Sequence, residues 1–328
     1  MKKIFKLTVF YLLLTALCIG FLSAGDGQID IAYLPFTISQ LGSYVVTANL
    51  TLSTTDTNGI TISAGNVTLD LNGHTLSGPG NATGSSGAGI YFSTDCYNIT
   101  IRNGVIQDWR GSGIDGFEFG ARHAHNCRIE SLQCYFNGGY GILVSDNCEI
   151  KDNICSDNGG SGISSRDLAV VINNVTKQNG SYGISASNSS CVTDNVCRQN
   201  ASSGINVINM NTVKNNTCTY NTGNGIQVGY GNLVINNNCA YNGYMAGDGA
   251  GINVDEYGNH NCIESNLIIE NDRGIDCNPA PNNYIAGNRA NDNTTDYDIA
   301  AGNTYGPIID ATAGGSIATT NHFANIRF

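Results

Sequence analysis

Charged residues are scarce in this chain of 328 residues, at 12%, and proline occurs only five times. No basic tract is present, and 15 Lys and Arg face 26 Asp and Glu. Nucleic-acid binding is therefore not expected, because it needs clustered positive charge against the phosphates. The net charge of −11 would also repel an anionic polysaccharide unless a cation intervened.

Two poor helix formers are abundant: 41 Gly and 44 Asn together make up 85 of the 328 residues. Both residue types are unfavourable in helices, which argues against a helical bundle or a coiled coil. Hydrophobic residues still account for 41% of the chain, which argues against disorder. Gly and Asn beside many Ile and Val are typical of short strands joined by tight turns.

Only one long apolar run occurs, at residues 7–22, after the basic residues Lys2, Lys3 and Lys6. Small residues follow it at 23–25, so 1–25 has the pattern of a signal peptide. We therefore expect a secreted, periplasmic or cell-surface protein without a membrane span in its mature chain.

A 21-residue repeat organises the rest of the chain. A Gly-Ile dipeptide recurs every 21 residues from Gly141 to Gly225, and related copies occur from Gly59 to Gly274. The cysteines share this period, with Thr176 in the one vacant place: Cys134, Cys155, Cys197, Cys218 and Cys239. The spacing indicates an inward column of small side chains, although disulfides between neighbouring coils stay open.

Each repeat holds three short apolar clusters separated by Asn, Asp or Gly, which predicts strands too short to be helices. Stacked copies predict an all-β parallel solenoid of about ten coils. The asparagines at 153, 174, 195, 216 and 237 are expected to form hydrogen bonds with one another along the rod at a sharp turn, where Asn tolerates left-handed backbone angles. We expect the solenoid to cover 59–310, capped by 26–58 and 311–328.

The repeat resembles the right-handed parallel β-helix family, the pectate-lyase-like superfamily. The segments LPFTISQLGSYVVTANL (34–50), NVTLDLNGHTLSG (66–78) and NITIRNGVIQDW (98–109) are similar to exported bacterial members of unassigned function. The resemblance implies a right-handed, single-stranded β-helix. The sequence has no Y-G-[FI]-D-P-H of alginate epimerases, no Asn-x-Asp, Asp-Asp and Gly-His-Gly set of polygalacturonases and no Arg-x-Pro-x-x-Arg of pectate lyases.

Insertions break the repeat in one turn. The usual count from the Ile of Gly-Ile to the next inward residue is 8, as from Ile142 to Ile150, but it is 15 from Ile114 to Ile129 and 11 in two other coils. The largest insertion lies within 108–126, where most of the chemically versatile residues gather. Insertions in a solenoid often carry its function.

An enzyme at this insertion would use Asp115, His123 or His125 as acid or base, and Arg122 to neutralise a substrate carboxylate. The expected substrate-binding residues are Trp109, Glu118, Tyr140, Asp146 and Asp167. Asp146 and Asp167 on neighbouring coils could bind Ca²⁺. The competing interpretations are that the histidines pack the loop, that Trp109 covers an edge of the solenoid, and that the two aspartates cap turns.

Three functions stay open from the sequence. The leading hypothesis is an exported glycan-associated binding or surface module, whose partner is a polysaccharide or cell-surface glycan. The second is a polysaccharide lyase, epimerase or hydrolase that acts through 108–126. The third is a structural protein or an accessory of metalloenzyme maturation.

Overall fold

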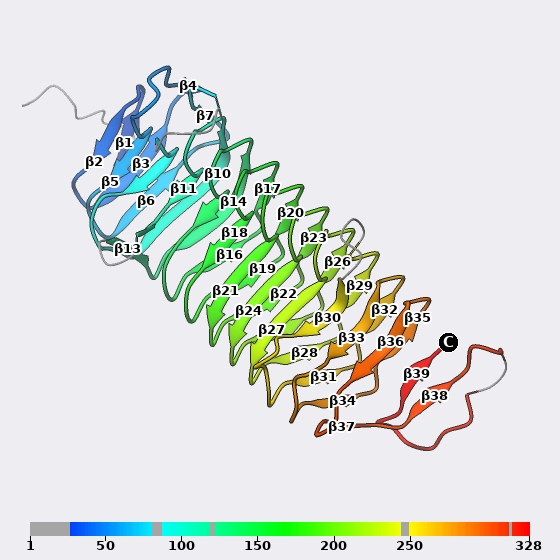
Figure 1. The fold of residues 1–328 in the computed structure, drawn as a ribbon. Helices are drawn as coiled ribbons and strands as arrows, with labels where there is room; N and C mark the ends of the chain where they lie inside the picture. Colours follow the sequence, from blue (N-terminus) through cyan, green and yellow to red (C-terminus); the bar gives the residue numbers. More distant parts are fainter. Residues whose placement is uncertain (1–26, 81–86, 119–121, 244–248, 315–316) are drawn as a thin grey trace, which may run out of the picture.

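The computed structural model describes residues 27–80, 87–118, 122–243, 249–314 and 317–328, so the signal peptide expected at 1–25 lies outside it. Over these ranges the chain winds into a rod of stacked coils without a helix (Figure 1). The coils run parallel and form a right-handed β-helix, which confirms the predicted fold. The described part of the chain therefore offers no helix that could cross a membrane.

One face of the rod is a sheet of twelve parallel strands, which we call the Gly-Ile sheet because most of its strands begin at that dipeptide. Side chains alternate between the interior and the surface, as in Ile60–Ile62. Its strands are β2 (Phe36–Ile38), β5 (Ile60–Ile62), β8 (Ile90–Phe92), β11 (Ile114–Asp115), β15 (Ile142–Leu143), β18 (Ile163–Ser165), β21 (Ile184–Asn188), β24 (Ile205–Asn209), β27 (Ile226–Tyr230), β30 (Ala250–Val254), β33 (Arg273–Cys277) and β36 (Thr295–Ile299).

A second sheet of 24 strands forms the other two faces and bends where each coil turns. In the regular coils each face receives one strand, while β10 and β14 run through both. Its strands are β1 (Gln28–Ile31), β3 (Gly42–Val46), β4 (Leu50–Thr51), β6 (Val67–Asp70), β7 (Thr75–Ser77), β10 (Ile99–Gln107), β14 (Arg128–Tyr135), β16 (Glu149–Lys151), β17 (Ile154–Ser156), β19 (Val170–Ile172), β20 (Val175–Lys177), β22 (Cys191–Thr193), β23 (Val196–Arg198), β25 (Thr212–Lys214), β26 (Thr217–Thr219), β28 (Leu233–Ile235), β29 (Asn238–Ala240), β31 (Cys262–Glu264), β32 (Leu267–Ile269), β34 (Tyr284–Ala286), β35 (Arg289–Asn291), β37 (Thr304–Tyr305), β38 (Ile308–Asp310) and β39 (Asn325–Arg327).

The coils begin earlier than the expected boundary at residue 59. Strand β2 already pairs in register with β5, from Phe36 opposite Ile60 to Ile38 opposite Ile62. The Gly-Ile sheet therefore has twelve strands in the described residues, against about ten expected coils. The first coil escaped the repeat because Pro35-Phe36 replaces the Gly-Ile dipeptide there. At the other end, β39 pairs with β35 and β38.

The interior consists of stacked columns of Ile, Val and Cys. The five cysteines of the repeat have no exposed surface, which confirms that they point inward. All eleven cysteines from Cys96 onward are free thiols in the structure. Burial and the hydrogen bond with Cys134 hold the pKa of the Cys155 thiol well above its usual value, so this thiol stays uncharged at neutral pH.

Buried asparagines stack at the turns, as the sequence predicts. In the predicted ladder, Asn174 donates from Nδ2 to Oδ1 of Asn195 at 3.0 Å and to the carbonyl of Ile150 at 2.9 Å. The left-handed angles, however, fall on the residue before each ladder asparagine, such as Asp152 and Asn173 with φ near 57°. The residue before each ladder asparagine therefore supplies the left-handed conformation of the turn.

A second asparagine ladder, not predicted from the sequence, follows at the next corner. Each Nδ2 donates to the Oδ1 of the next asparagine toward the C-terminus at 2.9 to 3.0 Å. Its members are Asn137, Asn158, Asn179, Asn200, Asn221, Asn242, Asn271 and Asn293. The last amide donates to the carboxylate of Asp296 at 2.9 Å.

Candidate functional site

The largest insertion folds into a small hairpin beside the Gly-Ile sheet. Strand β12 (Phe117–Glu118) pairs antiparallel with β13 (Arg122–His125), and β13 pairs parallel with β9 (Cys96–Tyr97). The register places His125 directly opposite Tyr97. The insertion is therefore ordered by strand pairing with the neighbouring coil, and this pairing fixes where His125 lies.

His125 forms the centre of a cluster of polar and aromatic side chains. Its ring stacks on Tyr97, with centroids 5.0 Å apart and planes 14° apart. Its Nδ1 lies 3.8 Å from Oδ2 of Asp146 on the next coil. Arg166 approaches the other oxygen of Asp146 at 3.8 Å, and its guanidinium lies over the Phe117 ring at 5.1 Å. We call Tyr97, Phe117, His125, Asp146 and Arg166 the proximal cluster.

The proximal cluster is open to solvent. Tyr97 is 49% exposed, while His125, Asp146 and Arg166 are partly exposed. At this exposure the ion pairs contribute about 1 kcal/mol or less each. The cluster therefore contributes little to stability, and its groups are accessible to a ligand.

Buried thiols support the cluster from below. The thiol of Cys127 donates to the carbonyl of His125 at 3.4 Å, and that of Cys148 donates to the carbonyl of Ala124 at 3.2 Å. The hydrogen bond with Cys148 and burial hold the pKa of the Cys127 thiol well above its usual value. These buried side chains hold the backbone carbonyls of Ala124 and His125 from the interior.

Asp146 and Asp167 belong to a ladder of side chains on neighbouring coils. Oδ1 of Asp146 accepts from the backbone N–H of Asp167 at 3.3 Å. Oδ1 of Asp167 accepts from Nδ2 of Asn188 at 2.9 Å. Each carboxylate thus fixes the next coil, as the turn-capping interpretation holds. The described residues contain no group of three or more His, Cys, Asp or Glu side chains suited to a metal ion, and Ca²⁺ stays a prediction.

Trp109 does not belong to the site. Its side chain is fully buried, and Nε1 donates to the carbonyl of Leu76 at 3.2 Å. Glycines make room for the indole, because a Cβ on Gly59 would lie 2.6 Å from its ring. The prediction that Trp109 binds substrate is therefore wrong, since the ring has no face in solvent.

The other predicted residues occupy different places. Asp115 is partly exposed on the outer face of the Gly-Ile sheet, opposite Tyr91 and Leu143. Tyr140 precedes strand β15, whereas Asp146 follows it, so the strand separates Tyr140 from the proximal cluster. The backbones of Glu118, Arg122 and His123 lie in the hairpin, but their side chains lie outside the described part of the structure, and their roles stay predictions.

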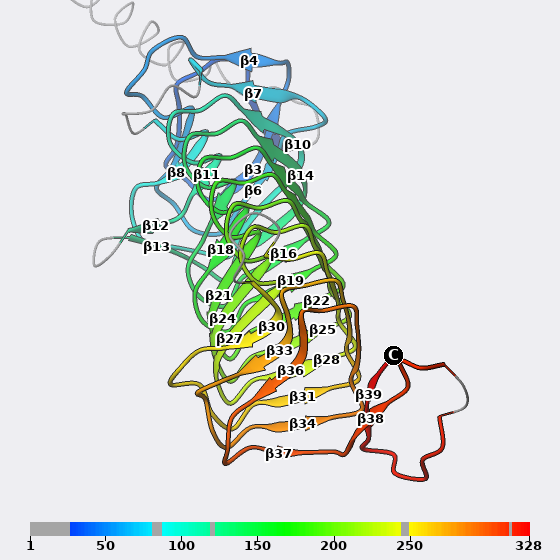
Figure 2. The same cartoon turned by 45° about the vertical axis from the view of Figure 1, so that its right-hand side comes forward.

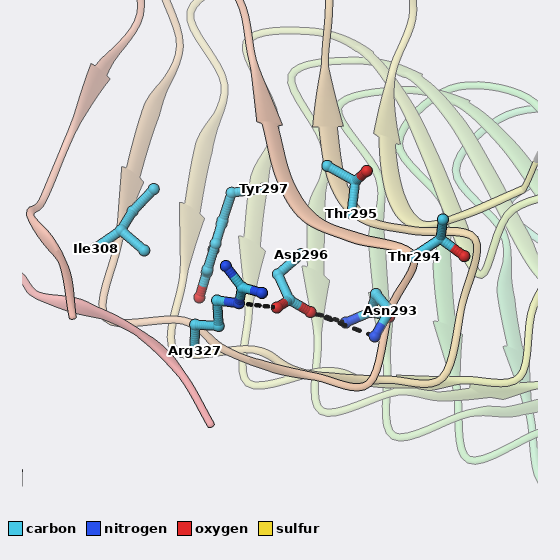
Figure 3. Close-up of a pocket in the computed structure, with 7 residues that line it drawn as sticks. All are labelled: Asn293, Thr294, Thr295, Asp296, Tyr297, Ile308 and Arg327. Atoms are coloured by element: carbon cyan, nitrogen blue, oxygen red, sulfur yellow. Dashed lines mark hydrogen bonds and ion pairs between the residues drawn. The ribbon is translucent and has the colours of Figure 1, made fainter. Parts of the chain in front are cut away.

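A pocket of about 320 Å³ lies at the opposite end of the rod, between the last coil and the closing segment (Figure 3). Its charged groups are satisfied by one another, because Nε of Arg327 lies 3.0 Å from Oδ2 of Asp296. Asn293 donates to the same carboxylate. This ion pair holds the closing strand against the last coil, so the pocket has a structural explanation.

The fold and the cluster define a right-handed parallel β-helix with an exposed polar and aromatic face. The family model described as right handed beta helix region matches residues 38–196 and 169–327. The chain therefore belongs to the right-handed β-helix family. No curated protein matches the sequence.

Several solved structures share the fold at low sequence identity. The A-module of mannuronan C-5 epimerase AlgE4 from Azotobacter vinelandii has a TM-score of 0.69 at 17% identity, over 86% of this chain and 91% of that one. The A-module of AlgE6 from the same organism has a TM-score of 0.57 at 16% identity, with coverages of 81% and 91%. The Dettilon tailspike protein gp208 has a TM-score of 0.58 at 15% identity, with coverages of 91% and 61%.

Proposed function

We propose that this chain is an exported polysaccharide-binding protein and that the proximal cluster contacts the glycan. The observation that carries the proposal is the exposed stack of Tyr97 and His125 beside Asp146 and Arg166. An aromatic ring offers an apolar face to a sugar ring, while a carboxylate accepts from sugar hydroxyls. Arg166 supplies a planar cation that matches a uronate carboxylate.

The comparisons support the same class of ligand. Two of the proteins with this fold are named as epimerases of mannuronan. Arg166 places one positive charge in the cluster of an acidic protein, opposite the carboxylate of Asp146. An exported location agrees with the sequence of residues 1–25 and would bring the protein to extracellular or periplasmic glycans.

The test is binding to a panel of neutral and uronate polysaccharides by affinity electrophoresis and calorimetry. We expect Tyr97→Ala to weaken binding up to about tenfold, because stacking of aromatic rings contributes roughly 0.5–1.5 kcal/mol. The matched control is Tyr220→Ala, since Tyr220 also stacks in a ring pair, with Tyr241, on another face. Wild-type protein that binds no glycan of the panel, or a Tyr97→Ala variant that binds like wild type, would refute the proposal.

A second candidate is a uronate lyase or epimerase, favoured by the arrangement of His125, Asp146 and Arg166. Asp146 lies beside Nδ1 of His125, so it would orient the imidazole as a general base. Arg166 would stabilise the negative charge that builds up on the uronate when its C5 proton leaves. Arg122 was predicted for this role and its side chain lies outside the described part of the structure, whereas Arg166 is an arginine of the described cluster.

Turnover in D₂O separates this enzyme from a binder. An epimerase incorporates deuterium at C5, and a lyase releases an unsaturated uronate. If the chain is an enzyme, His125→Ala should abolish both signals and keep glycan binding within about tenfold. Binding without turnover on polymannuronate, polyguluronate and polygalacturonate would eliminate the second candidate. Neither binding nor turnover would leave the structural or maturation role.

A further inference from the structure

A second aromatic cluster lies farther along the same side of the rod. The chain between β30 and β31 carries a later insertion, residues 255–261, in the same turn as the hairpin. Figure 2 shows the β12–β13 hairpin and this segment projecting from one side. Tyr257 is 84% exposed and Tyr230 is 40% exposed, and the Tyr230 ring lies 5.4 Å from that of His260. We call Tyr230, Tyr257 and His260 the distal cluster.

The distal cluster is held by backbone contacts. The N–H of Gly231 donates to the carbonyl of Asn259 at 2.9 Å, and the N–H of His260 donates to that of Asn282 at 2.9 Å. A Cβ on Gly258 would lie 2.7 Å from the carbonyl oxygen of Gly229, so only glycine fits this close approach. The aromatic side chains therefore stand on a segment fixed to the coils on either side.

A polar ladder joins the two clusters. After Asp146 and Asp167, Asn188 accepts at Oδ1 from Nδ2 of Asn209 at 2.9 Å. Asn209 in turn lies opposite Tyr230 in the Gly-Ile sheet. The side chains at one equivalent position of successive coils thus form a continuous row from Tyr97 to Tyr230. Aromatic rings lie at both ends of the row, and partly exposed carboxylates and amides lie between them.

We infer that the distal cluster is a second binding site for the same polysaccharide chain, which runs along the ladder parallel to the axis of the rod. This inference rests on the proposed function. Carboxylates and amides bind hydroxyl groups, and the rings at each end suit the flat faces of sugars. The row between the rings consists of carboxylates and amides, which form hydrogen bonds with sugar hydroxyls.

The distance between the clusters defines the ligand length. From Tyr97 to Tyr230 the row climbs six steps, through 125, 146, 167, 188 and 209, or about 29 Å at ~4.8 Å per step. One sugar of an extended chain advances by about one step, so roughly six to eight sugars reach both clusters. A trisaccharide reaches one cluster at a time. Affinity is therefore expected to rise with chain length until both ends are engaged.

The test compares oligomannuronates, oligogalacturonates and cello-oligosaccharides of three and eight residues. Wild-type protein should bind the octasaccharide of its preferred series about tenfold more tightly than the trisaccharide. The double variant Tyr230→Ala, Tyr257→Ala should lose that advantage and keep trisaccharide binding within about twofold. Tyr97→Ala should weaken both, and Tyr220→Ala should weaken neither. Thermal unfolding of each variant checks that the fold is kept.

The outcomes separate this inference from the function on which it rests. If wild-type protein binds neither length of any series, both ideas fail. If it binds the trisaccharide and octasaccharide equally, or if the double variant keeps the full advantage of the octasaccharide, the distal site is wrong. Binding at the proximal cluster then stands alone.

Discussion

The buried hydroxyl of Thr176 gives the sharpest test of the interior. Thr176 lies in register between Cys155 and Cys197 in the inward column, and its side chain has no exposed surface. Its Oγ1 has no hydrogen-bond partner among the residues that the structure describes. Thr176→Val replaces this hydroxyl with a methyl group of similar size and leaves the backbone carbonyl that accepts from Asn200 in place.

The expected change follows from the cost of a buried polar group without a partner. Such a group costs about 1–3 kcal/mol, because it has lost its bonds to water and gained none. Thr176→Val should therefore raise the free energy of unfolding by about 1–3 kcal/mol. Because a long repeat array need not unfold in two states, the midpoint of denaturant unfolding is the quantity to compare.

Thr217→Val provides the matched control. Thr217 occupies a partly exposed position opposite Val196 in the neighbouring coil, where its hydroxyl reaches water. Its replacement should change stability by about 0.5 kcal/mol or less. If Thr176→Val unfolds at the same or a lower denaturant concentration than wild type, the hydroxyl is not an unsatisfied group and the reasoning is wrong.

Two further predictions concern the thiols and the asparagine ladder. A thiol reagent should modify Cys191, which is partly exposed, before Cys262, because burial and the Glu264 carboxylate raise the pKa of Cys262 to about 12. A raised pKa lowers the thiolate fraction at neutral pH, so labelling of Cys262 should accelerate as the pH approaches 12, and rapid labelling at neutral pH would contradict this. Asn195→Ala should lower stability by about 1–3 kcal/mol, because it leaves the buried backbone N–H of Asn174 without its acceptor; a wild-type unfolding midpoint would contradict it.

The repeat is readable in the sequence because stacking places the same chemistry at the same point of every coil. A residue in the column of Ile150 must fill the interior and meet Val171 directly, so Ile or Val recurs every 21 residues. The expected coil number was too low because Phe36–Ile38 meets the same packing demand without the Gly-Ile dipeptide. The regular spacing of inward residues therefore indicates how the coils stack. The Gly-Ile dipeptide is only one of the sequences that can begin a strand of this sheet.

The proximal cluster was predicted only in part, because the insertion interrupts the 21-residue spacing by which residues on neighbouring coils are aligned. His125 and Asp146 were expected, but Tyr97, Phe117 and Arg166 were not. A signal for Tyr97 exists, since it lies four residues before the inward Ile101, as His125 lies four before Ile129. The position of a residue in the row can be found by counting back from the inward residue of the strand after the insertion. Counting forward from the strand before the insertion fails, because the length of the insertion varies between coils.

Trp109 shows the opposite failure. A lone tryptophan beside polar and charged residues has the composition of a binding site. Its position was decided instead by glycines far away in the sequence, since Gly59 and Gly89 leave the interior space that the indole fills. The sequence around Trp109 gives no sign of those glycines. The burial of Trp109 can therefore be predicted only after the coils have been stacked.

The second asparagine ladder gives the rod an electrical polarity. Its eight amides all point their N–H groups toward the C-terminal end, so their dipoles add and polarise one another. The positive end of this chain of dipoles meets the carboxylate of Asp296, much as an acidic side chain meets the N-terminus of a helix. A coil duplicated within the ladder would extend the polarity unchanged, whereas a rod that ended before Asp296 would leave that positive end without its counter-charge.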